Sequence, residues 1–384
     1  MVEWKKIKEI FDIRNGYTPS TKDECFWTGG NIPWFKMEDI RENGSVLNDS
    51  NLHITEKAIK GKGLFKANSI ILATSATIGE HALITVEHLS NQRFTNFYPK
   101  KEFEEFVNMK FIYYYMFIVD EWCKQHTHQG GFASVDMEGL YKLLIPIPSI
   151  SEQNRIVGIL DTFTASIENL KEQIAQRRKQ YEHYRNQLLD LEGKEGVEMK
   201  TIQDICKRIC SGGTPSTSHK EYYDGNIPWL RTQEIDWKDI YDTEIKITEE
   251  AIANSSAKII PVNCVIVAMY GATAAKTAIN KIPLSTNQAC CNLEIDVEKA
   301  LYKYVFHWLC KEYQNLKSMG EGSQNNINGK KIKDYFIPIP SLTEQSRIVS
   351  ILDTFEASIQ NLEAQLKERE KQYEYYRNKL LTFE

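Results

Sequence analysis

Two copies of an Asn-Ile-Pro-Trp motif, at 31–34 and 226–229, are the first candidates for chemistry in this sequence. Amino-methyltransferases use an Asn/Asp-Pro-Pro-aromatic loop, but here Ile stands at the second position and no FxGxG-like cofactor loop precedes it. Proline fixes φ and favours a turn or an extended entry to a strand. We therefore predict that both motifs are turns leading into strands, with Trp34 and Trp229 packed inside.

Three other patterns that would support catalysis or metal binding are weak as well. The segment 322–330 ends in Gly-Lys, but six residues separate its glycines where a phosphate-binding P-loop has four. Asp236, Glu244 and Lys246 fit a nuclease-like Asp…Glu-x-Lys pattern that arises by chance in most chains of this size. The His-Thr-His segment at 126–128 lacks an accompanying carboxylate constellation, so a surface loop is favoured over a metal site. We predict no catalytic and no metal-ligating residue.

Side chains that hydrogen-bond base edges or phosphates gather around the repeated motifs instead. Lys36 and Arg231 each stand two residues after the motif's Trp. Two small-residue loops, 73–79 and 268–274, follow β-rich runs, and their backbone can approach a ligand closely. The residues that we predict to contact DNA are Lys36, Thr74, Ser75, Thr77, Gln92, Arg93, Gln129, Arg231, Gln233, Tyr270, Thr273, Lys276, Gln288, Gln324, Asn325 and Asn326.

The charge balance limits how strongly either half would bind DNA alone. Residues 1–145 carry 17 basic and 19 acidic side chains, and residues 198–337 carry 17 of each. Affinity for DNA grows with the number of phosphates neutralised, and free-standing DNA-binding domains are usually basic. Three explanations stay open: the basic residues cluster on one face, a partner supplies much of the phosphate contact, or the chain does not bind DNA.

The positions of the motifs show that this chain of 384 residues is a duplication. Ile-Pro-Ile-Pro-Ser recurs at 145–149 and 337–341, an offset of 192. Gly-Asn-Ile-Pro-Trp recurs at 30–34 and 225–229, an offset of 195. All shared anchors occur in the same order, so the two halves are homologous units.

Each half ends in a segment with an apolar a/d heptad seam, which indicates a coiled coil. The first seam runs from Ile156 to Leu188 and the second from Ile348 to Leu380, and each helix opens with a Ser-x-x-Glu capping box after a Pro. A helix of about 39 residues is about 58 Å long. The simplest arrangement pairs the helices antiparallel, as a rod with one globular domain near each end and a pseudo-two-fold axis. A parallel intermolecular coiled coil is the alternative.

The helical segments are far more alike than the globular parts, since residues 151–189 and 343–381 share 26 of 39 positions. Either the helices bind the same partner twice while the globular parts bind different things, or long helices simply tolerate fewer changes. We predict a partner-binding surface at identical polar positions, with a solvated face of intrahelical pairs as the alternative. These positions are Glu152, Gln153, Arg155, Asp161, Ser166, Asn169, Glu344, Gln345, Arg347, Asp353, Ser358 and Asn361.

Composition is that of an ordinary globular protein. The 42% apolar and 26% charged residues exclude wholesale disorder, and the length predicts two or more domains. The longest apolar stretch, 111–119, is far shorter than the ~20 residues of a membrane span, and no charged-then-apolar leader opens the chain. We therefore expect a cytoplasmic protein. Eight cysteines without a CxxC pair predict reduced, mostly buried thiols.

Two divergent globular regions, each followed by a near-identical helix that opens with IPIPS(I/L)xEQxRIV, resemble the specificity subunit of Type I restriction–modification enzymes. The resemblance covers essentially the whole chain. It implies an α+β fold in which an antiparallel two-helix coiled coil separates two target recognition domains. The expected boundaries are recognition domain 1 at 1–145, spacer helix 1 at 146–190, a linker at 191–197, recognition domain 2 at 198–337 and spacer helix 2 at 338–384.

The resemblance also implies the function and the partners. Each recognition domain would read one half of a bipartite double-stranded DNA target, while the coiled coil sets the spacing and docks two methyltransferase (modification) subunits. The chain itself would bind no cofactor: S-adenosylmethionine is expected on the adenine-N6 methyltransferase partner, and ATP and Mg on two restriction motor–nuclease subunits. A coiled-coil scaffold that holds two different protein partners is the alternative function, and a stand-alone methyltransferase is the third.

Overall fold

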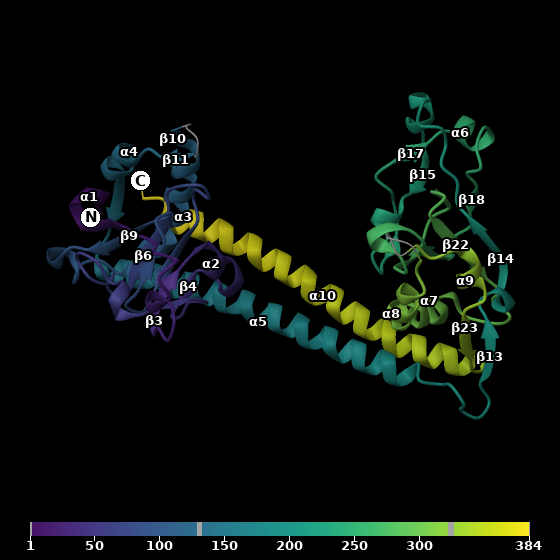
Figure 1. The fold of residues 1–384 in the computed structure, drawn as a ribbon. Coiled ribbons are helices and arrows are strands. Elements are labelled where there is room, and N and C mark those ends of the chain that lie inside the picture. Colours follow the sequence, from purple (N-terminus) through teal and green to yellow (C-terminus); the bar gives the residue numbers. More distant parts are fainter. Residues whose placement is uncertain (1, 129–132, 322–325, 384) are drawn as a thin grey trace. The chain divides into compact units, whose positions relative to one another are not determined.

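The computed structural model describes residues 2–128, 133–321 and 326–383. Gln129, Gln324 and Asn325, which are predicted DNA contacts, lie outside these residues. The chain divides into two compact units, and Figure 1 shows its elements in sequence colours. Unit 1 comprises residues 1–169 with 365–384, and unit 2 comprises residues 170–364. Each unit thus holds one globular domain and part of each of the two long helices, α5 (Ile150–Leu188) and α10 (Leu342–Leu381).

Unit 1 is built on a five-stranded sheet of order β2-β9-β6-β7-β4, with a three-stranded sheet β5-β3-β8 and the strand pairs β1-β12 and β10-β11. Its strands are β1 (Glu3–Lys6), β2 (Phe11–Asn15), β3 (Ile32–Phe35), β4 (Val46–Leu47), β5 (His53–Ile54), β6 (Ser69–Ala73), β7 (His81–Ile84), β8 (Leu89–Ser90), β9 (Phe94–Pro99), β10 (Thr127–His128), β11 (Ser134–Val135) and β12 (Leu144–Ile147). Its shorter helices are α1 (Ile7–Ile10), α2 (Met37–Asn43), α3 (Met109–Gln125) and α4 (Met137–Lys142), with 3-10 turns at Glu24–Phe26, Glu56–Ala58 and Lys101–Phe103.

Unit 2 repeats this plan with a five-stranded sheet of order β14-β22-β19-β20-β16, a four-stranded sheet β17-β15-β21-β18 and the pair β13-β23. Its strands are β13 (Glu198–Thr201), β14 (Cys206–Ser211), β15 (Ile227–Leu230), β16 (Asp239–Ile240), β17 (Lys246–Ile247), β18 (Ile259–Ile260), β19 (Val265–Ala268), β20 (Thr277–Asn280), β21 (Leu284–Thr286), β22 (Cys290–Ile295) and β23 (Phe336–Ile339). Its shorter helices are α6 (Glu249–Ala253), α7 (Tyr302–Lys311), α8 (Tyr313–Ser318) and α9 (Gly329–Lys333), with 3-10 turns at Gln203–Ile205, Lys220–Tyr223, Thr232–Glu234 and Gly271–Thr273.

The Asn-Ile-Pro-Trp motifs form equivalent strands in the two units. They are β3 and β15, and each pairs in parallel with a short strand, β8 or β21. Trp34 and Trp229 are buried, and each indole Nε1–H donates to a backbone carbonyl 3.0 Å away, of Tyr17 and Gly213 respectively. The prediction that the Trp of each motif packs inside is therefore confirmed, but Ile, Pro and Trp of each motif belong to the strand itself and not to a turn before it.

The first turns of each long helix belong to the core of the preceding domain. Ile156 and Leu160 of α5 pack with the β6 and α3 side chains of unit 1, and Ile348 and Leu352 of α10 pack with β19 and α7 in unit 2. The Ser half of each predicted capping box is present, since the backbone N–H groups of Glu152 and Glu344 donate to the hydroxyls of Ser149 and Ser341 at 3.4 and 3.3 Å. The two Glu carboxylates bond to Arg155 and Arg347 instead. Apolar burial and the caps thus fix where each helix starts.

Within each unit a segment of α5 contacts a segment of α10. In unit 1 the rings of Phe163 and Tyr376 stack at 5.3 Å. In unit 2 the rings of Tyr184 and Phe355 stack at 5.3 Å, and Arg178 forms an ion pair of 2.6 Å with Glu363. As α5 advances from 178 to 184 in unit 2, its partners on α10 run backwards from 363 to 355, so these two segments are antiparallel.

All eight cysteines are free thiols, and five of them are buried. The prediction of reduced, mostly buried cysteines is therefore confirmed. Burial raises the pKa of Cys123 and of Cys264 to about 12, so these thiols stay protonated and are poor nucleophiles.

Candidate nucleic-acid interface

Three segments that carry predicted DNA contacts, 35–36, 74–77 and 91–93, meet in unit 1 with a fourth segment, 133–135, and we call these four segments loop cluster 1. Backbone hydrogen bonds hold them: Thr74 N donates to Arg93 O at 2.9 Å, and Val135 N donates to Thr74 O at 2.9 Å. Asn91 N donates to Phe35 O at 3.0 Å, which joins the end of β3 to the turn before β9. Because β6 and β9 are adjacent antiparallel strands, the end of one lies beside the start of the other.

The same construction recurs in unit 2 as loop cluster 2, residues 230–231, 269–275, 287–289 and 326–327. Met269 N donates to Ala289 O at 2.8 Å and Ile327 N to Met269 O at 2.8 Å. Asn287 N donates to Leu230 O at 2.9 Å, the equivalent of the Asn91–Phe35 bond. The structure therefore brings most of the described predicted residues of each domain together, although they lie far apart in the sequence.

Both clusters contain an alanine in the left-handed backbone region. Ala76 has φ +66° and Ala275 has φ +70°, whereas residues with a Cβ rarely adopt positive φ. Such strained backbone persists only where surrounding structure imposes it, and it concentrates at binding loops. The two alanines are not equivalent, because the shared backbone bonds align Ala76 with Gly271 (φ +77°) and Ala275 with Gly79 (φ +79°). Both loops therefore keep positive φ at the same two places, with one alanine and one glycine in each.

The side chains of loop cluster 1 differ in their freedom to bind. Gln92 and Arg93 are exposed, and within the described residues the Arg93 guanidinium has no hydrogen-bonding or ion-pair partner. Lys36 is half-buried, 3.9 Å from Glu38. The Thr74 hydroxyl bonds to that of Thr95 at 2.9 Å, so it is partly engaged in holding the loop. Ser75 and Thr77 are half-buried.

The cation of loop cluster 2, Arg231, is already paired, and so is Lys276, which directly follows the cluster. The Arg231 guanidinium binds Glu234 at 3.3 Å and also binds Glu244. The Lys276 ammonium lies 2.6 Å from Asp236, on the ring of Trp237. A paired cation is a weaker attractor for phosphate than a free one, so the neutral side chains offer most of this cluster's binding capacity. Tyr270, Gln233 and Gln288 are exposed, Thr273 is half-buried, and the Asn326 amide accepts from Gly271 N at 3.4 Å.

Two of the predicted partner-binding residues lie inside their own domains, so this prediction was wrong for them. Gln153 is fully buried, and its amide bonds to Asn108 N, Phe106 O and Pro148 O, each at 2.8 Å. Gln345 is buried in the same way, with its Oε1 accepting from Leu301 N at 2.8 Å. Both amides satisfy backbone groups of the adjoining domain, which explains their identity without a partner.

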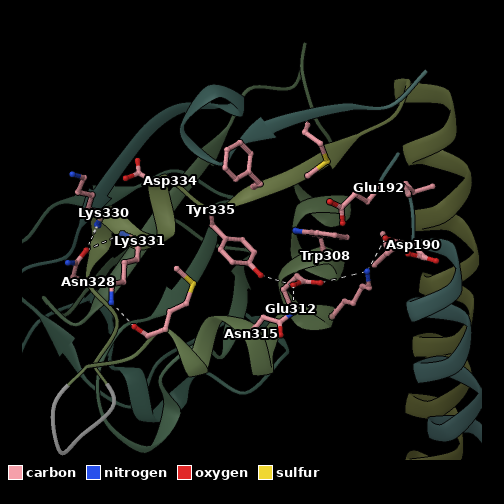
Figure 2. Close-up of a pocket in the computed structure, with 16 residues that line it drawn as sticks. Asp190, Glu192, Trp308, Glu312, Asn315, Asn328, Lys330, Lys331, Asp334 and Tyr335 are labelled. Atoms are coloured by element: carbon pink, nitrogen blue, oxygen red, sulfur yellow. Dashed lines mark hydrogen bonds and ion pairs between the residues drawn. The ribbon is translucent and has the colours of Figure 1, made fainter. Parts of the chain in front are cut away.

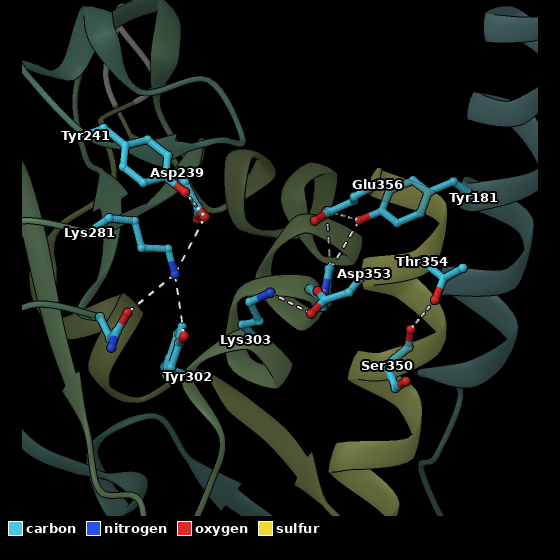
Figure 3. Close-up of polar contacts among 12 residues, drawn as sticks. Tyr181, Asp239, Tyr241, Lys281, Tyr302, Lys303, Ser350, Asp353, Thr354 and Glu356 are labelled. Atoms are coloured by element: carbon cyan, nitrogen blue, oxygen red, sulfur yellow. Dashed lines mark hydrogen bonds and ion pairs between the residues drawn. The ribbon is translucent and has the colours of Figure 1, made fainter. Parts of the chain in front are cut away.

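Asp161 and Asp353 also anchor a helix to its own domain. In unit 1, Asp161 accepts from the Lys110 ammonium at 2.8 Å and from the Tyr114 hydroxyl at 2.6 Å. Burial, with this bond to a carboxylate, raises the pKa of Tyr114, so the phenol stays protonated and donates. In unit 2, Asp353 accepts from Lys303 at 2.5 Å and lies 3.4 Å from Nε2 of His307 (Figure 3). We did not predict these partners of the two aspartates from the sequence. Both pairs have the same i, i+4 spacing: Lys110 with Tyr114, and Lys303 with His307.

The remaining predicted partner positions face outward. Glu152 and Arg155 form a two-bond ion pair of 2.6 and 2.7 Å, and Glu344 and Arg347 repeat it. The two hydrogen bonds from Arg155 lower the pKa of Glu152. Their exposure agrees with either alternative, a partner surface or a solvated face. The other four, also exposed or half-buried, are Ser166, Asn169, Ser358 and Asn361.

Comparison with known proteins identifies this arrangement. The family model for the Type I restriction modification DNA specificity domain matches the chain twice, over residues 1–177 and 194–370. The chain belongs to the family of Type I restriction–modification specificity subunits. The two matched segments correspond to the two homologous halves, so each half is one DNA specificity domain.

Two curated relatives come from Escherichia coli. The specificity subunit of the Type I restriction enzyme EcoprrI is 47% identical over 222 residues, or 54% of this chain and 54% of that subunit. The specificity subunit of EcoR124I/EcoR124II is 35% identical over 293 residues, or 72% of this chain and 71% of that one. The chain thus spans only about half the length of the first of these relatives.

Solved structures share the fold over the whole length. The S subunit of the Type I restriction–modification system from M. genitalium has a TM-score of 0.60 at 16% identity, covering 100% of this chain and 97% of that chain. A chain from a structural study of the assembly and conformational transition of the type I R-M system has a TM-score of 0.66 at 17% identity, with 99% and 96% covered. At these identities the similarity establishes the fold alone.

One cavity of the specificity subunit lies in unit 2 and has a volume of about 660 Å³. Figure 2 shows the Glu312 carboxylate, which accepts from the Tyr335 hydroxyl and from the Asn315 amide, each at 2.6 Å. None of the described predicted DNA contacts lines this cavity.

The described group of His307, Asp353 and Glu356 is compact enough to hold a cation, since its ligand atoms lie within 4.8 Å of one another. The two ring nitrogens of His307 face different carboxylates, however, and Asp353 is already paired with Lys303 (Figure 3). We therefore interpret the group as a hydrogen-bonded junction between α7 and α10. Within the described residues, no helix of the specificity subunit is both long and apolar enough to cross a membrane.

Proposed function

We propose that this specificity subunit reads a bipartite DNA sequence, one half with each specificity domain, and leaves the chemistry to partner subunits. The observation that carries this proposal is the recurrence of one loop framework with different side chains. The frameworks share their backbone bonds and two positions of positive φ, whereas one displays an Arg93 that is unpaired among the described residues and the other a Tyr270 and paired cations. A common framework with divergent contacts is what two readers of unlike half-sites require.

The long helices would act as the spacer between the half-sites. Because α5 and α10 are continuous and of 39 and 40 residues, an antiparallel coiled coil would be about 58 Å long, a length that matches about 17 base-pair steps. Two domains on such a spacer would contact half-sites roughly one to one-and-a-half turns of DNA apart. The heptad seam and the contacts between the helix segments in each unit support this part of the proposal.

Two methyltransferase subunits would dock on the helices. After the buried positions are removed, a stripe of identical, outward positions remains on each helix: Arg155, Thr162, Ser166 and Asn169 on α5, and Arg347, Thr354, Ser358 and Asn361 on α10. Within the described part of the chain, the hydroxyls of Thr162 and Thr354 bond only to their own helix backbone. Core packing does not explain their identity, but a partner bound twice does.

Partner subunits would also supply the charge and the catalysis. Each specificity domain is close to neutral, so the methyltransferase subunits would contribute much of the phosphate contact. S-adenosylmethionine would bind to the methyltransferase, and ATP and Mg to the two restriction motor–nuclease subunits. This chain would bind none of them.

The test is an Arg93→Ala variant in the complex with methyltransferase subunits. Arg93 is exposed and has no partner in the described part of the chain, so its loss should weaken binding about 10–100-fold through one half-site, with the other half-site read as before. The readout is binding selection from a randomised DNA library, together with a map of methylated adenines.

Arg41→Ala is the matched control, because Arg41 is an exposed arginine of the same domain, paired with Glu80 outside loop cluster 1. It should leave both half-sites unchanged. If the wild-type complex shows no sequence preference, the recognition role is wrong and a scaffold for two protein partners becomes the better explanation.

A further inference from the structure

A pocket of matching construction lies in each unit where the C-terminal part of a long helix meets a globular domain. The pocket of unit 1 has a volume of about 640 Å³ and that of unit 2 about 520 Å³. The same three helix side chains line both: Glu374, Arg377 and Asn378 in unit 1, and Glu182, Arg185 and Asn186 in unit 2. These are equivalent positions of α10 and α5.

Each pocket contains a buried donor without a partner. Within the described chain, the Nε–H groups of Arg377 and Arg185 are buried and make no hydrogen bond. The Arg377 guanidinium lies 4.5 Å from the ring of Phe117, and that of Arg185 lies 5.5 Å from the ring of Tyr181, so aromatic rings hold both in place. Leaving such a donor unpaired costs about 1–3 kcal/mol of stability. The same arginine is nevertheless present at the equivalent position of both long helices.

The pockets also offer acceptors. Glu182 and Glu374 are exposed carboxylates beside the arginines. In unit 1, Oδ1 of Asp120 is buried and unpartnered among the described residues, while its Oδ2 lies 2.6 Å from His81 Nδ1. A ligand common to both pockets must therefore accept from a guanidinium N–H and can donate to a carboxylate.

The charges that line the two pockets limit the kind of ligand that can bind in both. In unit 2 the two cations, Arg185 and Lys311, balance the two carboxylates, Glu182 and Glu356. In unit 1 the two cations, Lys124 and Arg377, are outnumbered by four carboxylates. These are Glu80, Asp120, Glu121 and Glu374. A phosphate or other simple anion would be repelled in unit 1, so DNA does not fit both pockets. An amide group, with one acceptor and one donor, fits both.

The domain walls of the pockets differ while the helix residues do not. Phe117 and Ile118 of unit 1 are replaced by Cys310 and Lys311 in unit 2. Packing against unlike walls does not require the same Glu, Arg and Asn. A ligand that is the same in both pockets does require them, and a partner present in two copies supplies such a ligand.

We propose that each pocket receives an amide-bearing peptide segment of the modification subunit, anchored by Arg377 in unit 1 and by Arg185 in unit 2. This inference rests on the proposed function, in which two such subunits bind. It assigns one anchor to each of them, so the two docking events become separable by mutation.

The experiment measures how many modification subunits bind the full-length chain, by native mass spectrometry and by titration. The wild type should bind two. Arg185→Ala and Arg377→Ala should each weaken one of the two binding events about 10–100-fold, and the double variant should weaken both. Arg178→Ala is the matched control: Arg178 is an exposed arginine on α5 whose equivalent is Glu370, and its loss should leave both events unchanged.

A second pair of variants separates docking from stability. Asn186→Leu and Asn378→Leu obstruct the pockets while keeping the arginines, and they should give the same loss without a large shift in melting temperature. If the folded double arginine variant binds two subunits with wild-type affinity, the pockets hold solvent only and the inference is wrong. If the wild type binds no modification subunit, the proposed function itself fails.

Discussion

The two junctions between a long helix and its own domain share one half of their chemistry and differ in the other. In unit 1, Asp161 is held by Lys110 and by the Tyr114 hydroxyl. In unit 2, Asp353 is held by Lys303, but a histidine, His307, takes the place of the tyrosine. The aspartate and the lysine were retained through the divergence of the halves, whereas their third partner was not.

The replacement in unit 2 brings further polar partners. His307 is almost fully buried, and its Nδ1 lies 3.1 Å from the Tyr181 hydroxyl and 3.7 Å from Glu356. Tyr181 in turn donates to Glu356 at 3.0 Å. Burial, followed by the nearby charge of Glu356, raises the pKa of Tyr181, so this phenol remains a donor. Unit 1 has Thr164 at the position of Glu356, so its junction is simpler.

This comparison teaches that identity between the two helices has two sources. At positions 153 and 161 identity preserves the attachment of a helix to its own domain. At positions such as 162 and 166, where the side chains face outward, that explanation does not apply. Only the second group bears on a shared partner.

The largest effect expected from testing the junctions is that of Gln153→Leu and Gln345→Leu. Each change leaves buried backbone groups without hydrogen bonds, so each should lower the free energy of unfolding by about 3 kcal/mol or more. Urea unfolding measures this loss, and Thr162→Ala serves as an exposed control on the same helix, with an effect within about 0.5 kcal/mol. A loss in one variant but not in the other would break the equivalence of the junctions.

A smaller effect is expected from Asp353→Asn, and it depends on pH. Burial tends to raise the pKa of Asp353, but hydrogen bonds from His307 and Lys303 outweigh it, so the pKa is lowered. A carboxyl whose pKa is depressed in the folded state stabilises the protein above its unfolded value of about 3.9, and this contribution is lost as the pH falls through the folded value.

The variant should therefore lose about 1 kcal/mol at neutral pH, because the carboxylate is half-exposed and screened. It should also show less acid destabilisation below about pH 4 than the wild type. Urea unfolding of both proteins between pH 5 and pH 3 measures the difference. Parallel pH profiles would mean that Asp353 is not the group that responds.

The smallest effect is expected from the double change His307→Tyr and Glu356→Thr, which rebuilds the unit 1 junction in unit 2. A tyrosine hydroxyl can donate to Asp353 as Tyr114 does to Asp161, so stability should change by less than about 1 kcal/mol. Thermal unfolding tests this, with His307→Ala as the comparison that removes the donor altogether. A double variant as unstable as His307→Ala would show that the two junctions are not interchangeable.

The sequence by itself determined the duplication, the capped starts of α5 and α10, the strands that begin at the Asn-Ile-Pro-Trp motifs, and the family. These features depend on contacts within a few residues or on a repeat spacing, and such information is local. The heptad seam also identified which helix stripe would be apolar.

Only the tertiary structure decided which identical helix residues are anchors and which are outward. Gln153 and Asp161 look like surface residues by type and spacing, but their partners Asn108 and Lys110 lie 45 and 51 residues away. Arg231 likewise looks free in the sequence, yet Glu244 neutralises it across a turn between strands. A polar side chain becomes structural when distant backbone and charges close around it, and no periodic pattern encodes that closure.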